Sequence, residues 1–322
     1  MHEQLLIQYL IIGLANGALI ALIALGYTIV YGIVEIINFA HGEVFMLGAF
    51  FAATVITWTG VNNKSSSLAI IGVVLLGLIC AMAFSAVLNF GIDRVAYKRL
   101  RNAPRLAPLI AAIGFSFIFQ NIGIYWKGSN AFSPPNLIPV KLRTYNILNE
   151  WFSFDTKVRV RPLDFAVLVL TIPLLILLTW FVYRTKTGRA MRATAQDRDA
   201  AALMGVDINR AIGVAFVLGG AMAGAAGMLA LYYNNSARFQ MGFRYGLFAF
   251  TAAVLGGIGN LNGAVLGGFI IGLVWSLSDG YMKEFVSGWG AQWTPSVIFG
   301  VLVIMMIFKP SGLLGEHTTD KV

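Results

Sequence analysis

The first long hydrophobic stretch of the sequence, residues 9–58, is interrupted by polar side chains that could do chemistry. Ionisable groups at membrane depth are costly, and they usually face the interior of a helix bundle or a water-filled cavity. A group of this kind can line a path for a solute or break a helix. The candidates for a translocation path or helix break are Asn38, His41, Gly42 and Glu43, with Glu35 shortly before them.

Two local structures explain this polar group. The Ala-His-Gly step at 40–42 suits a break in a membrane helix, where the freed backbone groups meet polar partners. A short cytoplasmic turn over 31–43, with the side chains in water at the interface, accounts for the same residues. The sequence favours neither alternative over the other.

Glycines are concentrated in the segment 256–268, which holds six of them in thirteen residues. A nucleotide-binding loop is a poor interpretation, because no Gly-Lys-Ser/Thr is present and the flanks are apolar. Glycine at this density favours close backbone approach and a sharp reversal between short helices, with direct substrate contact as the alternative. Small residues three and four apart in 211–232 favour close helix packing as well. The glycines expected at packing or turn positions are Gly220, Gly224, Gly256, Gly257, Gly259 and Gly263.

The polar segment 184–210 predicts a short amphipathic helix. From Arg189 to Met204 it is rich in Ala, Met, Leu, Arg and Gln, which are strong helix formers, and Gly205 is expected to end the helix. Such a helix, with Ala and Leu on one side and charge on the other, suits docking into a groove of a partner. An ordinary amphipathic helix on the membrane surface is the alternative.

Several catalytic signatures are missing from the sequence. It has no Walker A motif, no HExxH, no GxSxG and no set of carboxylates spread over several hydrophobic segments as in a proton relay. Cys80 is the single cysteine, so neither a disulfide framework nor a CxxC metal site is available. We therefore expect no enzymatic activity, no ATP hydrolysis by this chain itself and no metal site.

The elements that position these residues are predicted to be membrane helices. The chain is 58% hydrophobic and only 11% charged, far below the charge of soluble domains, and its mean hydropathy is +0.77. Eight gaps between charged residues each hold at least about 19 residues, roughly the length of a membrane-spanning helix. The sequence predicts an all-α, polytopic membrane helix bundle of about 8–10 segments, some short or discontinuous, in one transmembrane domain over 1–322.

Basic residues set the expected orientation. The loops 91–106 and 184–210 are rich in Lys and Arg and are placed in the cytoplasm by the positive-inside rule. The loop 127–162 is then external, the N-terminus outside and the C-terminus inside. These loops also explain the net charge of +9 without nucleic acid as a partner. Spans are expected near 9–30, 38–58, 67–90, 107–126, 163–183, 211–232, 246–258, 263–280 and 294–309.

Four motifs in order resemble one known family, the branched-chain amino-acid ABC permeases, and in particular their LivH-type subunit. The resemblance covers nearly the whole chain and is weakest in 127–162. The motifs are GYTIVYGIVEIINFAHGEVFMLGA (26–49), IDRVAYKRLR (92–101), RAMRATAQDRDAAALMGV (189–206) and FTAAVLGGIGNLNGAVLGG (250–268).

The resemblance implies one subunit of an ATP-driven importer of branched-chain amino acids in a bacterial-type inner membrane. It implies a second, homologous permease subunit, two cytoplasmic ATPase subunits that use ATP and Mg, and an external substrate-binding protein, with no cofactor bound by this chain. Many such permeases have Glu where this chain has Gln196, which suggests that Gln196 is not critical. The expected ATPase-coupling residues are Ala195, Asp197, Arg198, Ala201, Leu203 and Gly205.

Other transporter classes remain as alternatives. Related ABC permeases for urea, amides or another small polar solute share the architecture. An ion-coupled secondary transporter would use Glu35, His41 and Glu43 as its coupling site, but the later spans hold no carboxylates to complete a relay. A channel or structural membrane protein would leave the helix of 184–210 without a role.

Overall fold

The computed structural model describes residues 2–101, 103–104, 106–137, 161–286 and 288–315. In these residues the chain is helical, apart from turns and one isolated β-bridge, so the all-α prediction is confirmed. The long helices are α1 (His2–Val34), α2 (His41–Thr59), α3 (Ser67–Ile92), α5 (Leu106–Lys127), α8 (Pro162–Arg184), α11 (Ile208–Asn234) and α13 (Leu261–Asp279). The shorter elements are η1 (Asp93–Tyr97), α4 (Lys98–Leu100), α9 (Lys186–Gln196), α10 (Arg198–Leu203), α12 (Met241–Gly256), η2 (Tyr281–Glu284) and α14 (Thr294–Phe308).

Seven helices of the described chain are long and apolar enough to cross a membrane. Two shorter apolar helices, α12 and α14, accompany them. Together they make nine apolar segments, within the predicted range, and the short ones match the predicted discontinuous segments.

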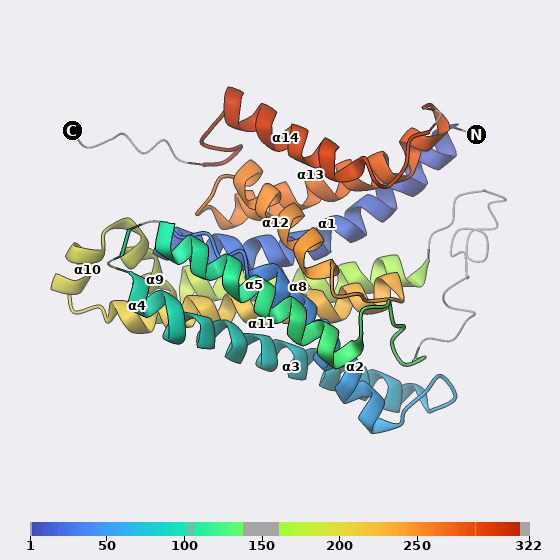
Figure 1. Ribbon diagram of the computed structural model, residues 1–322, viewed down its shortest axis with the longest axis horizontal. Coiled ribbons are helices and arrows are strands. Elements are labelled where there is room, and N and C mark those ends of the chain that lie inside the picture. Colours follow the sequence, from blue (N-terminus) through green and yellow to red (C-terminus); the bar gives the residue numbers. More distant parts are fainter. Residues whose placement is uncertain (1, 102, 105, 138–160, 287, 316–322) are drawn as a thin grey trace.

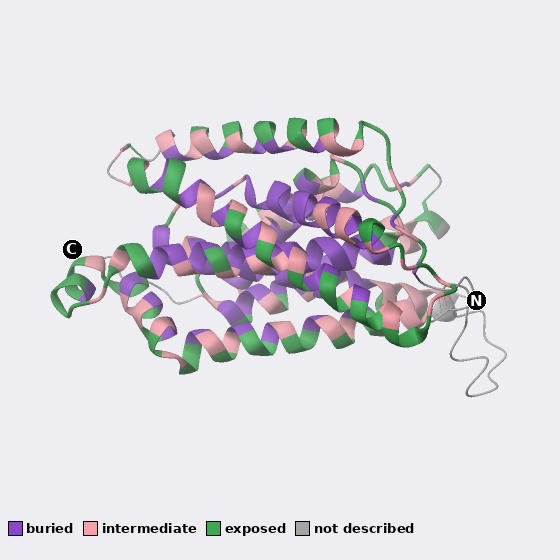
Figure 2. Cartoon of the chain, turned by 90° about the horizontal axis from the view of Figure 1, so that it is seen from below, coloured by how far each residue is buried: buried purple, intermediate pink, exposed green. Residues whose placement is uncertain are grey.

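The bundle has a buried centre and a lipid-facing exterior. The helices at the centre of the bundle are mostly buried, and those on its outside have many exposed residues (Figure 2). Helices α1 and α11 are the most buried of the candidate spans, whereas α3, α5 and α8 are far more exposed. The outer helices carry large apolar side chains on their exposed faces, for example Ile79, Val169 and Ile304. Apolar surface of this extent is stable against hydrocarbon, where the backbone bonds of a helix are all satisfied internally.

Glycines bring the central helices into backbone contact. A Cβ at Gly220 or Gly224 of α11 would overlap backbone atoms of Ser85 and Ala81 in α3. The α1–α13 contact is similar, because a Cβ at Gly272 would overlap the backbone of Gly17. Close approach of this kind gives helices in lipid their van der Waals attraction.

The glycine-rich segment forms the reversal between α12 and α13. Gly257 and Gly259 have φ angles of 105° and 92°, which residues other than glycine rarely adopt. Asn260 then caps α13 by accepting a hydrogen bond from the amide of Gly263 at 3.0 Å. A Cβ at Gly263 would overlap the backbone of Gly256, so the two helices touch where they meet.

The segment predicted as one helix from Arg189 to Met204 is two helices, and that prediction is wrong. Asp197 is extended (φ −158°, ψ 112°) and separates α9 from α10. Its carboxylate accepts a hydrogen bond from the amide of Ala200 at 2.9 Å, so it caps α10 in place of continuing the helix. Gly205, with φ 82°, follows the end of α10 as expected.

The bundle has two distinct ends (Figure 1). The start of α1 lies at one end, and α9 and α10 lie at the other. The predicted external loop 127–162 falls mostly on residues 138–160, outside the described residues. In its described part, Phe132 forms the β-bridge with Ala237.

Candidate functional site

The polar group of the first hydrophobic stretch lies at a true break between α1 and α2. α1 ends at Val34, and Glu35 follows in the left-handed conformation with φ 57°. Glu35 is exposed, whereas Asn38, His41 and Glu43 are buried. The interfacial-turn interpretation therefore fits Glu35, and the helix-break interpretation fits the other three.

Asn38 holds the break in place through buried hydrogen bonds. Its Oδ1 accepts from the hydroxyl of Tyr97 and from the amide of Ala40, both at 3.1 Å. Its Nδ2 donates to Oδ1 of Asn89 at 3.2 Å, and Asn89 donates in turn to the carbonyl of Phe216 at 2.7 Å. The Asn38 side chain thus satisfies a backbone amide of the break and is itself held by Tyr97 and by Asn89 of α3.

The start of α2 is packed against α12 and α1 without space for further side chains. A Cβ at Gly42 would overlap the carbonyl oxygen of Gly242 and lie 2.8 Å from Cα of Gly246. The ring of His41 lies edge-on to Tyr27 of α1, with ring centroids 4.7 Å apart. A Cβ at Gly26 would overlap the same imidazole. The break is therefore fixed from both sides.

Glu43 is fully buried and interacts with α5. Its Oε1 accepts hydrogen bonds from Nε2 of Gln120 at 2.8 Å and from the hydroxyl of Ser116 at 3.3 Å. Its Oε2 has no hydrogen-bond partner within the described part of the chain and lies against Gly242, where a Cβ would overlap it. In the described part of the chain, Glu43 forms no ion pair.

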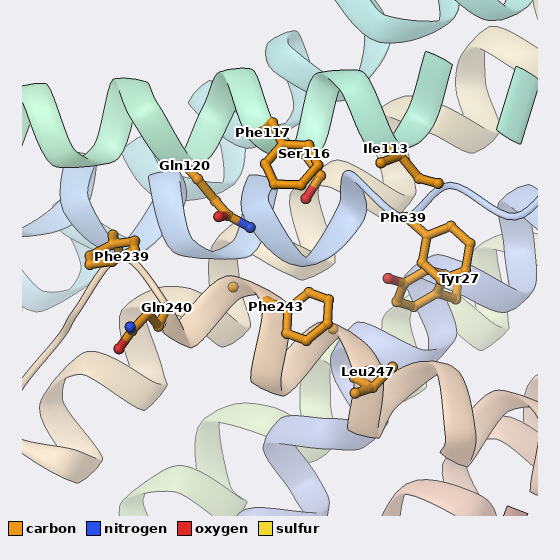
Figure 3. Close-up of a pocket in the computed structure, with 12 residues that line it drawn as sticks. Tyr27, Phe39, Ile113, Ser116, Phe117, Gln120, Phe239, Gln240, Phe243 and Leu247 are labelled. Carbon is orange, nitrogen blue, oxygen red and sulfur yellow. The ribbon is translucent and has the colours of Figure 1, made fainter. Parts of the chain in front are cut away.

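These contacts border a cavity of about 590 Å³ between α5, α12 and the α1–α2 break (Figure 3). Ser116 and Gln120 of α5 face Phe243 across it. Most of the lining is aromatic or aliphatic, and both Phe117 and Phe243 are 61% exposed, so the cavity opens to the surface of the chain. The lining residues are Tyr27, Phe39, Ile113, Ser116, Phe117, Gln120, Phe239, Gln240, Gly242, Phe243, Gly246 and Leu247.

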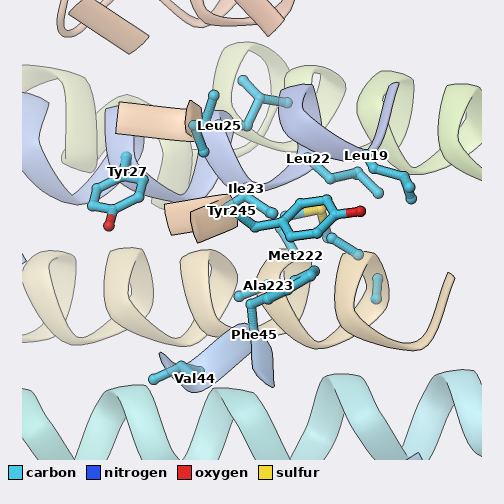
Figure 4. Close-up of a cluster of buried hydrophobic side chains, with 14 of the residues drawn as sticks. Leu19, Leu22, Ile23, Leu25, Tyr27, Val44, Phe45, Met222, Ala223 and Tyr245 are labelled. Atoms are coloured by element: carbon cyan, nitrogen blue, oxygen red, sulfur yellow. The ribbon is translucent and has the colours of Figure 1, made fainter. Parts of the chain in front are cut away.

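A close-packed apolar cluster lies behind the break (Figure 4). Leu22 and Ile23 of α1 lie beside Phe45 of α2, Met222 of α11 and Tyr245 of α12, all buried. Cores of this density do not deform continuously. Tyr27 belongs both to this cluster and to the cavity lining, so the cavity adjoins a part of the bundle that resists deformation.

Some of the residues predicted to couple to an ATPase are directed into the bundle, and others are exposed at its end. Arg198 points inward, and its Nη2 donates to the carbonyl of Ile33 in the last turn of α1 at 2.7 Å. Ala201 is buried, whereas Leu203 and Met204 are 89% and 84% exposed. Ala195 borders a small groove between α1, α8 and α9. The end of the bundle thus presents exposed apolar side chains on a helix tied to α1.

Sequence reasoning missed the polar cavity residues outside the first motif. Ser116 and Gln120 are four residues apart and therefore share one face of α5. They are among the few polar side chains in that span, and this feature of the sequence could have identified them as candidates for a site. Nothing in the sequence indicated that α2 would place a carboxylate against this face.

A membrane helix bundle with a polar-edged apolar cavity and an exposed, tethered end helix has the features of a solute permease. The family described as "Branched-chain amino acid transport system / permease component" matches residues 9–307. The chain belongs to this family, and the family predicted from the four motifs is confirmed.

Relatives of similar length are named as permease proteins of branched-chain amino acid transport systems. The high-affinity branched-chain amino acid transport system permease protein LivH of Salmonella typhimurium is 35% identical over 327 residues, covering the whole of both chains. The corresponding protein BraD of Pseudomonas aeruginosa is 37% identical over 320 residues, 98% of each chain. Among solved structures, PsaBC of Streptococcus pneumoniae in complex with Fab aligns over 96% of this chain and 92% of that one. Its TM-score of 0.46 and 14% identity make it too distant for an argument about the site.

Proposed function

We propose that this chain is a transmembrane subunit of an ATP-driven importer and translocates branched-chain, aliphatic amino acids. The observation that supports it best is full-length similarity to permeases named for high-affinity branched-chain amino acid transport. The cavity agrees with this substrate class, because its aromatic and aliphatic lining suits a branched alkyl side chain and its polar edge suits a charged backbone.

The proposed complex has further subunits. A second, homologous permease would complete the pore, and two cytoplasmic ATPases would use ATP and Mg²⁺. An external binding protein would deliver the substrate. The cavity opens at the surface beside Phe117 and Phe243, and its polar edge at Ser116 and Gln120 suits a second permease subunit better than lipid. In the proposed orientation within a bacterial inner membrane, the N-terminus is outside and α9 and α10 are cytoplasmic.

The mechanism follows from the contact between α10 and α1. Closure of the ATPase pair would move α10 through Leu203 and Met204, which are exposed at the end of the bundle. Arg198 would transmit this movement to the last turn of α1 through the carbonyl of Ile33. The α1–α2 break comes next along the chain after Ile33, and α2 then carries Glu43 behind the cavity edge. Because a packed core does not deform continuously, such a movement would switch the helices between two discrete arrangements.

The rival functions fit the cavity less well. Urea and short amides are small and polar, whereas most of the lining residues are aromatic or aliphatic. An ion-coupled transporter needs a chain of titratable groups through the membrane. Glu43 is a single buried carboxylate at the cavity, and the buried Asp93 and Asp164 are each paired with an arginine.

Uptake by the reconstituted complex tests this proposal. The chain is co-expressed with the second permease and the ATPases, placed in proteoliposomes containing ATP, and supplied with binding protein and radiolabelled leucine. We expect uptake that requires internal ATP and persists when ionophores collapse ion gradients. Uptake that does not require ATP and depends on a proton or sodium gradient would contradict the proposal.

A further inference from the structure

Glu43 is a carboxylate at membrane depth that has no positively charged partner among the described residues. It is fully buried in the start of α2 and forms no ion pair among the described residues. A buried charge is costly unless it is paired, and in membrane helices such groups mark ligand or ion sites. Its surroundings therefore suggest a cation that is absent from the protein itself.

The hydrogen bonds of Glu43 determine what its neighbours present to the cavity. In its ionised form the Glu43 carboxylate only accepts hydrogen bonds, and Nε2 of Gln120 and the hydroxyl of Ser116 both donate to it. The carbonyl oxygen of Gln120 and the lone pairs of Ser116 are then left for the cavity, which both residues line. The cavity edge is thus made of acceptors, with a negative charge directly behind them.

The rest of the lining suits a cation as well. Of the residues that the structure describes, no Lys, Arg or His lines this cavity. The aromatic residues Phe39, Phe117, Phe239 and Phe243 offer ring faces and edges, and ring faces attract ammonium groups. Among the described residues, the edge at Ser116 and Gln120 has no positive partner for a carboxylate, whereas Arg238 and Arg244 line the adjoining cavity, which shares Gln240 and Phe243. The charge arrangement is therefore selective for one end of a zwitterion.

We propose that the cavity edge formed by Ser116 and Gln120, with Glu43 buried behind it, binds the α-ammonium group of the transported amino acid during its passage. Oε1 of Gln120 and Oγ of Ser116 accept hydrogen bonds from the ammonium, and the Glu43 carboxylate supplies the compensating charge. This site rests on the proposed function and adds a selection step within the pore, separate from selection by the binding protein. It places the branched side chain among the phenylalanines.

Binding of two matched probes to the purified complex tests the site without transport. The probes are 3-methylbutylamine and 4-methylpentanoate, which carry an ammonium and a carboxylate, respectively, on a branched alkyl chain. Affinity is measured by titration calorimetry or saturation-transfer NMR, without binding protein. The wild-type complex should bind the amine in clear preference to the acid. Glu43→Gln should weaken amine binding about tenfold, since it removes the charge and keeps the shape.

Two further variants distinguish loss of the site from misfolding of the chain. Gln120→Met keeps Glu43 and the side-chain volume but removes the accepting carbonyl, and it should also weaken amine binding about tenfold. Glu35→Gln makes the same change at an exposed carboxylate eight residues away and should leave amine binding unaltered. Size-exclusion chromatography with the ATPases shows that each variant assembles.

The outcomes separate this site from the proposed function. Amine affinity that stays within twofold of wild type in both Glu43→Gln and Gln120→Met overturns the site, even if leucine uptake is ATP-driven. Equal binding of amine and acid by the wild-type complex overturns it as well. A wild-type complex that fails to import leucine contradicts the proposed function, and the binding result still decides whether an ammonium site exists.

Discussion

The cavity edge at the start of α2 and the α9–α10 pair at the end of the bundle differ in how they are held. At the cavity edge, Gly42 and Gly242 are in backbone contact, and Glu43 is enclosed by α5 and α12. At the bundle end, α10 has six residues, exposes Leu203 and is joined to α1 by one hydrogen bond from Arg198. The same chain therefore has one region that tolerates almost no change in volume and one with a surface free to meet a partner.

This difference assigns separate tasks to the two regions. A rigid edge preserves the geometry of groups that meet a substrate, because packed interiors respond to added volume with strain. An exposed apolar tip with few internal contacts suits binding, where one or two buried side chains dominate the energy. Substitutions that add volume in the first region should change folding, and substitutions in the second should change coupling.

The largest effect is expected from filling the glycine contact at the cavity edge. Gly42→Val would push a side chain into the carbonyl of Gly242 and Cα of Gly246. Overpacking of this kind should destabilise the chain by about 3 kcal/mol and lower its accumulation in the membrane. Gly72→Val is the matched control, since a Cβ at Gly72 meets nothing within 4 Å. Equal melting temperatures of the two variants would show that the edge is not tightly packed.

The next effect concerns the exposed tip of α10. Leu203→Glu should leave accumulation of the chain unchanged, because the side chain is exposed, and should release the ATPases. A central interface residue contributes about 2 kcal/mol or more, so co-purification of the ATPases should fall by more than about tenfold. Leu314→Glu changes another exposed leucine and should leave co-purification intact. Loss of ATPase in both variants would point to a general surface effect.

A smaller effect is expected at the link between the two regions. Arg198→Met removes the hydrogen bond to Ile33, and a bond from a charged donor contributes about 1.5–3 kcal/mol. The ATPases should remain bound, while leucine imported per ATP hydrolysed falls about tenfold. Arg192→Met is the control, because Arg192 donates to the carbonyl of Tyr183 in α8 and not to the carbonyl of Ile33 in α1. Unchanged stoichiometry in Arg198→Met would contradict the proposed path.

The smallest effect concerns the hydrogen bonds that hold the break. Tyr97→Phe removes the hydroxyl that donates to Asn38, while Ala40 continues to donate to the same oxygen. We expect a loss of about 1 kcal/mol, seen as a fall of about 2 °C in the melting temperature of the complex. Tyr125→Phe, at a fully exposed position, should produce no change. A larger loss for Tyr125→Phe would remove the support for a structural role of the Asn38 network.

The fold was predictable because the bilayer imposes strong rules on sequence. Charge-free gaps located the spans, and glycine density located the reversal at 257–260. The break at Asp197 was missed because its neighbours are strong helix formers, and the capping contact with Ala200 is a local competition that propensity alone does not resolve.

The candidate site was predictable only in part. The polar residues from Asn38 to Glu43 are anomalous in any hydrophobic span, so their burial in a helix break could be proposed. Ser116 and Gln120 lie 73 and 77 residues further along the chain, and their contact with Glu43 depends on how α5 packs against α2. Tertiary contacts of that kind have no periodic signature in the sequence.

The most direct test of the account is whether loaded binding protein stimulates ATP hydrolysis through this chain. The complex is reconstituted with its ATPases and binding protein, and ATPase rates are compared with and without leucine for wild type and Leu203→Glu. The account predicts a several-fold stimulation by leucine-loaded binding protein that is lost in the variant. An ATPase that never associates with the chain, or stimulation that survives Leu203→Glu unchanged, would contradict it.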